Sequence, residues 1–202
     1  MTREQDLLLQ RAAGLGFGNG EVAEMTGLGR SKVRYRRDSL GLPTSSRVAS
    51  TRNTMRRKSA PDRAEWVISL GVFRAFLLGS GGRLSISEVI LGAYEDYLID
   101  YEIRVGNAEK LKENGLSVPE KVEPNIYYQS CIRMAEGCLL LEPCPCKKMY
   151  SVVDLSDDEN DMVPRGCPCN RLSGKDEVLG QKRTVQVTDA GDNEEQKSVA
   201  AE

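Results

Sequence analysis

The tripeptide Cys-Pro-Cys occurs twice in this chain of 202 residues, at 144–146 and 167–169, and this repeat constrains the fold more than any other feature. Proline stiffens the backbone between the two cysteines of each pair. The 20 residues between the pairs allow the chain to return on itself. Because four thiolates form a closed tetrahedral zinc site, the sequence predicts one structural Zn²⁺ held by Cys144, Cys146, Cys167 and Cys169.

The other readings of these cysteines are a pair of disulfides and a thiol-based redox switch. No signal peptide is visible, and the longest apolar stretch, 66–78, contains Arg74 and is too short to span a bilayer. We therefore expect a cytoplasmic protein without a membrane partner, and reducing conditions favour metal binding over disulfides. Cys131 and Cys138 lie seven residues apart on one apolar helical stripe, which predicts core thiols, with Cys138 as a substitute ligand if one of the four does not coordinate.

The chain contains no histidine, and this absence removes many kinds of enzyme chemistry. A Ser-His-Asp triad, a Cys-His dyad and a histidine-ligated catalytic zinc are all excluded. The phosphate-binding motif GxxxxGK[ST] is absent as well. A zinc ion with four protein ligands has no open position for a substrate, so we expect a protein that is not an enzyme.

Charge is distributed unevenly along the chain. Residues 1–60 contain 12 Lys and Arg against 5 Asp and Glu, a net charge of +7, whereas the remainder has a net charge of −9. A basic N-terminal third indicates an anionic partner, most commonly nucleic acid.

Residues 19–38 fit the pattern of a helix-turn-helix, with Val22 and Ala23 on the first helix, Gly27 in the turn and Val33 anchoring the second helix. The second helix is expected to expose a basic face. We predict contacts to base edges from Arg30, Ser31, Arg34 and Tyr35. We predict contacts to phosphates from Lys32, Arg36 and Arg37, and from the basic arm that follows, Arg56, Arg57 and Lys58. The alternative is a helical hairpin with a solvated basic face and a solvated tether.

The remaining pattern predicts a mostly α-helical protein. Helices are expected over 61–78, over 85–101, where Ser85 and Glu88 form a capping box, and over 125–141. The predicted organisation is a helix-turn-helix region (1–42), a basic linker (43–60), a helical body that binds a partner (61–141), a zinc-binding loop (142–172) and a disordered acidic tail (173–202).

Taken in order, these features resemble FlhC, the larger subunit of the bacterial flagellar master activator, and related activators of conjugative plasmids and integrative conjugative elements. The resemblance is carried by the basic helix-turn-helix, by "AEWVISLGVFRAFLLGSG", "SISEVILGAYEDYLIDYE" and "PNIYYQSCIRMAEGCLLLEPCPC", and by the second cysteine pair. It covers roughly residues 5–172. The acidic segment 154–161 and the tail differ from the family pattern, which favours a mobile-element activator over a flagellar one.

This resemblance implies a transcriptional activator that works in a hetero-oligomer with a small helical FlhD-like partner, binds promoter DNA and recruits RNA polymerase. It also implies one zinc ion on the four cysteines of the repeated tripeptide. Two other functions remain open from the residues themselves. One is a zinc-stabilised interaction scaffold without sequence-specific DNA binding, and the other is a thiol-based redox sensor.

Overall fold

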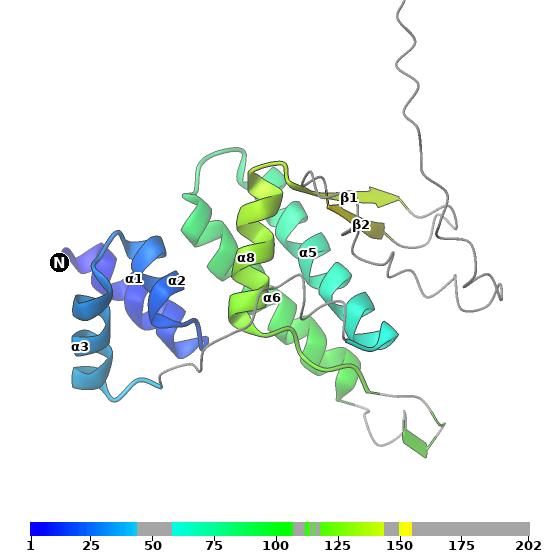
Figure 1. The fold of residues 1–202 in the computed structure, drawn as a ribbon, viewed down its shortest axis with the longest axis horizontal. Coiled ribbons are helices and arrows are strands. Elements are labelled where there is room, and N and C mark those ends of the chain that lie inside the picture. Colours follow the sequence, from blue (N-terminus) through cyan, green and yellow to red (C-terminus); the bar gives the residue numbers. More distant parts are fainter. Residues whose placement is uncertain (44–57, 107–111, 114, 116–117, 144–149, 155–202) are drawn as a thin grey trace, which may run out of the picture.

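A computed structural model describes residues 1–43, 58–106, 112–113, 115, 118–143 and 150–154 (Figure 1). Within this part the chain forms six helices and one two-stranded sheet, so the predicted mostly α-helical class is confirmed. Most of the predicted basic linker and zinc-binding loop lies outside the described residues, as does the whole of the predicted acidic tail.

Three short helices form the N-terminal part: α1 (Arg3–Gly14), α2 (Asn19–Thr26) and α3 (Arg30–Leu40). Helix α1 begins with a capping box, in which Thr2 and Gln5 satisfy each other's backbone N–H groups. Gly27 ends α2 and Gly41 ends α3, both at positive φ, where glycine is favoured. Figure 1 shows α3 at the outer edge of the molecule, and it packs mainly against α2 and α1.

The body consists of α5 (Ala60–Ser80), α6 (Ile86–Val105) and α8 (Pro124–Ala135). Capping boxes start α5 at Ser59 and α6 at Ser85, and the second of these confirms the prediction from the sequence. Helices α5 and α6, which a short turn joins, make more contacts with each other than any other pair of helices in the described part of the chain. None of the helices in the described part of the chain is long and apolar enough to cross a membrane.

The prediction of a helix over 125–141 is wrong at its C-terminal end. Helix α8 stops at Ala135, and Gly137 adopts a left-handed φ of 76° while the Cys138 N–H bonds back to the Arg133 carbonyl oxygen. The chain then enters strand β1 (Leu139–Pro143), which pairs antiparallel with β2 (Tyr150–Asp154). Burial of Leu139 and Val152 against the helices stabilises this hairpin, and local periodicity does not reveal it.

A single apolar core joins the N-terminal helices to the body. Phe17, in the turn after α1, contacts Tyr94 of α6 edge-on at a centroid distance of 5.3 Å and Tyr128 of α8 at 6.4 Å. The Tyr94 hydroxyl donates to the Val122 carbonyl oxygen (2.8 Å), and the Tyr97 hydroxyl accepts from the Val122 N–H (2.9 Å). Tyr94 and Tyr97 of α6 are therefore core residues.

A test of this packing uses the close approach of α5 and α6. A Cβ atom at Gly92 would lie 2.9 Å from Cε1 of Phe76, whereas a Cβ atom at Gly71, within α5, would meet nothing within 4 Å. We expect Gly92→Ala to destabilise the protein by about 1–3 kcal/mol through overpacking. Gly71→Ala, the matched control, should stabilise it by about 0.5–1 kcal/mol. Chemical denaturation measures both, and equal effects of the two substitutions would contradict the close helix crossing.

Candidate nucleic-acid interface

Helix α3 has one buried face and one exposed basic face. Val33 is buried in the core and fixes the helix against α2 and α1. The side chains of Arg34 and Tyr35 are 76% and 77% exposed. The other exposed residues of the first two turns are Arg30, Ser31 and Lys32. These five residues, which we call the α3 basic face, are all exposed as predicted.

The start of α2 lies close to this face. Neither Gly18, before α2, nor Gly29, before α3, supplies a side-chain cap to the backbone N–H groups of the helix that follows. The guanidinium of Arg30 lies over the start of α2, since its Nη2 is 3.6 Å from the place of a Cβ atom on Gly20. Two positive helix ends and a guanidinium group together attract an anion such as phosphate.

Arg36, a predicted phosphate contact, is bonded within the protein instead. Its Nε and Nη2 donate to the two carboxylate oxygens of Asp6 on α1, at 2.7 and 2.8 Å. The Arg36 hydrogen bond lowers the pKa of Asp6 below its ordinary value, and Gln10 donates to the same carboxylate. Arg36 thus cross-links α3 to α1. No local sequence signal links these residues, because 30 positions separate them.

Arg37 was predicted to be exposed, and this prediction is wrong. Its side chain is fully buried, with Nη1 donating to the Phe17 carbonyl oxygen at 2.7 Å and Nη2 donating to the Pro43 carbonyl oxygen. The reason is helical geometry: Arg37 follows Val33 by four residues and therefore shares its inward face. That spacing was visible in the sequence, but the charge of arginine suggested the opposite orientation.

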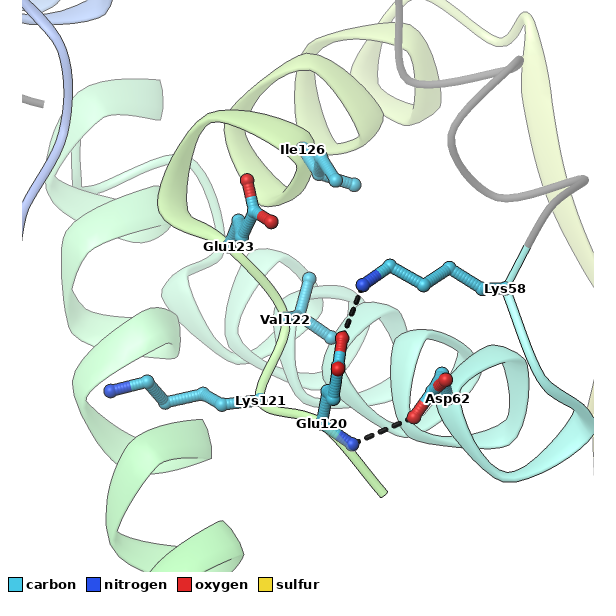
Figure 2. A pocket seen from close by; sticks show the side chains of 7 residues that line it. All are labelled: Lys58, Asp62, Glu120, Lys121, Val122, Glu123 and Ile126. Atoms are coloured by element: carbon cyan, nitrogen blue, oxygen red, sulfur yellow. Dashed lines mark hydrogen bonds and ion pairs between the residues drawn. The ribbon is translucent and has the colours of Figure 1, made fainter. Parts of the chain in front are cut away.

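Lys58 also has a partner in the fold. Figure 2 shows its ammonium group directed at Glu120, with which it forms an ion pair, while the Glu120 N–H donates to Asp62 of α5 at 2.7 Å. These groups line a pocket of about 10 Å³, which has room for about one water molecule. Arg56 and Arg57, the other predicted contacts of the basic arm, lie outside the described residues.

The four predicted zinc ligands also lie outside the described residues. Strand β1 ends at Pro143, directly before Cys144, and β2 begins at Tyr150. Of the two other cysteines, Cys131 is fully buried in the core as predicted, and burial raises the pKa of its thiol. Cys138 is half-buried and follows the end of α8, so its predicted place on the helical stripe is wrong. Within the described ranges, no group of three or more potential ligands could hold a metal ion.

Comparison of the chain with protein-family models, with curated proteins and with solved structures finds no match. The resemblance to FlhC stays a prediction from the sequence features given above.

The Arg36–Asp6 pair predicts a pH-dependent stability. Because the folded-state pKa of Asp6 is lowered from 3.8, its contribution is present above pH 3.8 and is lost as the pH falls through the lower folded value. We expect Asp6→Asn to lower the melting temperature at pH 7 and to have a progressively smaller effect as the pH falls below 3.8. Glu4→Gln, which changes an exposed carboxylate on the same helix, is the control. An Asp6→Asn effect independent of pH, measured by thermal unfolding between pH 2 and 7, would contradict the pairing.

Proposed function

We propose that this protein is a DNA-binding subunit of a transcriptional activator, in which α2 and α3 form a helix-turn-helix and α3 is the recognition helix. The observation that carries this proposal is the α3 basic face. It presents three cations, a serine and a tyrosine at the outer edge of the molecule, and its one nearby acidic partner on α3 is the exposed Asp38, whose carboxylate lies 4.0 Å from Nε of Arg34.

The exposed side chains have different roles in this proposal. Arg34 and Tyr35 lie on the second turn of α3 and are about three-quarters exposed, so they contact base edges, with Arg30 and Ser31 before them. Lys32 and the first N–H groups of α2 and α3 bind phosphates. Arg36 and Arg37 do not belong to this contact set, because their guanidinium groups are bonded inside the fold. Arg56 and Arg57 remain predicted contacts of the basic arm.

The body would bind the second subunit. By its resemblance to FlhC, the protein would act in the cytoplasm with a small helical FlhD-like partner and recruit RNA polymerase to promoters. Large apolar side chains exposed on the body helices, Leu78, Ile99 and Ile103, supply surface for such contacts.

The zinc ion would brace the end of the β1–β2 hairpin. The donor set of four thiolates suits Zn²⁺, and the hairpin ends at Pro143 and Tyr150, on either side of the first cysteine pair. When bound, the metal would supply a cross-link between distant chain segments and no catalytic step.

Selection of random duplex DNA tests the proposed function. We expect the purified protein, alone or with its partner subunit, to enrich a sequence motif at near-physiological salt. Arg34→Ala should weaken binding to that motif by about 1–3 kcal/mol and relax the preference at one position. Arg83→Ala, which removes an exposed arginine from the turn between α5 and α6, is the matched control. Weak, salt-sensitive binding without a motif would favour the interaction scaffold instead.

Metal analysis tests the zinc proposal. Freshly purified protein should contain about one zinc per chain, and Cys167→Ser should reduce this content and lower the melting temperature, because a structural zinc site contributes folding free energy. Cys131→Ser, which changes a cysteine of the core, should leave the zinc content unchanged. A zinc content well below one per chain in the wild type, combined with reversible oxidation of the thiols, would favour the redox sensor.

A further inference from the structure

We propose that Arg37 is the positioning residue that fixes the recognition helix α3 to the turn carrying Phe17, which packs against the body of the protein. This inference rests on the DNA-binding function proposed above. Arg37 does not touch DNA in this proposal. It determines how the α3 basic face is held.

The acceptor that Arg37 binds is firmly placed by the body. Nη1 donates to the carbonyl oxygen of Phe17 at 2.7 Å. The Phe17 ring lies between the two halves of the molecule, against Tyr94 of α6 and Tyr128 of α8, and its N–H donates to the Ala12 carbonyl oxygen at 3.1 Å. Arg37 therefore connects α3 to the turn whose aromatic ring packs against the body.

Arg37 also fixes the point where the chain leaves α3. Its Nη2 donates to the Pro43 carbonyl oxygen, and its own carbonyl oxygen accepts from the Leu42 N–H at 3.0 Å. Gly41, which follows the last residue of α3, adopts the left-handed conformation that ends the helix. The Arg37 side chain thus binds the first residues beyond the helix, while its backbone carbonyl group closes the C-terminal turn.

The charge of Arg37 indicates that stability alone does not explain its presence. Among the described residues no carboxylate bonds to the guanidinium group, and its Nε has no hydrogen-bond partner. Glu21 and Asp38 act on it only at a distance, and burial lowers its pKa. A buried cation paired only with carbonyl oxygens pays a desolvation penalty that an apolar side chain of similar length avoids.

The planar guanidinium group does what an apolar side chain cannot do, since it donates to two carbonyl oxygens in a fixed geometry. Recognition of bases requires side chains held within about 0.5 Å of their productive positions. A helix α3 held at a fixed angle to the rest of the protein keeps the side chains of the α3 basic face in such positions. The other anchors, Val33 in the core and the Arg36–Asp6 pair, hold α3 against α2 and α1.

The test compares Arg37→Met, Arg37→Lys and a control, Arg83→Met. Arg83 is suitable because its guanidinium group also donates to carbonyl oxygens at a helix end, those of Ser80 and Gly79, but is exposed and belongs to the turn between α5 and α6. Three quantities are measured for each variant: the melting temperature, the affinity for the selected DNA motif as a function of salt, and amide hydrogen exchange in residues 15–18 and 38–43.

We expect Arg37→Met to keep or raise the melting temperature while weakening DNA binding about tenfold, which corresponds to about 1.4 kcal/mol. The salt dependence should be unchanged, because no phosphate contact is removed. Amide hydrogen exchange in residues 38–43 should accelerate.

Arg37→Lys keeps the charge without the planar guanidinium group and should bind DNA as weakly as Arg37→Met does. Arg83→Met should match the wild type. If Arg37→Met does not fold, Arg37→Gln gives a second neutral variant with one remaining donor, and we expect it to bind DNA with intermediate affinity.

Three results would overturn this inference. Wild-type affinity in Arg37→Met or in Arg37→Lys would show that the fork does not position α3. A fall in the salt slope by about one would show that Arg37 contacts a phosphate directly. A parallel loss of melting temperature and affinity would show a general structural role. If the wild-type protein itself binds no DNA, the proposed function fails, and the DNA-binding part of this inference fails with it. Unchanged amide hydrogen exchange in Arg37→Met would separately refute the anchoring of α3.

Discussion

The cluster of aromatic rings around Phe17 and Tyr94 is the contact on which the rest of the structure depends. Phe17 comes from the glycine-rich turn after α1, whereas Tyr94 comes from α6 and Tyr128 from α8, so the cluster joins the N-terminal helices to the body. Apolar ring surface provides the main driving force, and the edge-on geometry adds to it. The hydroxyl groups of Tyr94 and Tyr97 then bind the backbone of Val122, which places the segment leading into α8.

Two buried charged groups, Glu65 and Arg37, offset the cost of losing their hydration in different ways. Glu65, inside the body, receives two hydrogen bonds of 2.6 Å from Arg104, which also binds Asp100. That carboxylate is fully compensated by an opposite charge. Arg37 is compensated only by carbonyl dipoles. The body thus uses a charge pair to stabilise its helices, whereas the N-terminal part uses an unpaired cation where the orientation of a helix matters.

The two faces of α3 divide the work of the proposed function. Arg36 and Arg37 turn toward the protein and hold the helix, while Arg30, Lys32, Arg34 and Tyr35 turn toward solvent. A helix whose own cations were all exposed would depend on Val33 alone for its attachment. The cations of α3 therefore serve two purposes: those of the α3 basic face supply positive charge toward solvent, and Arg36 and Arg37 hold the helix that carries it.

The sequence by itself determined the elements whose causes are local. The capping box at Ser85, the glycine that ends α2 and the apolar period of α6 each act within a few residues, and each is found where it was predicted. Only the tertiary structure decided the β1–β2 hairpin and the roles of Arg36 and Arg37. Their partners, Asp154 for Leu139, Asp6 for Arg36 and Phe17 for Arg37, lie between 15 and 30 positions away, so no local pattern could indicate these partners, although the spacing from Val33 places Arg37 on the inward face of its helix. Charge predicted exposure for these arginines, but packing and long-range hydrogen bonds decided otherwise.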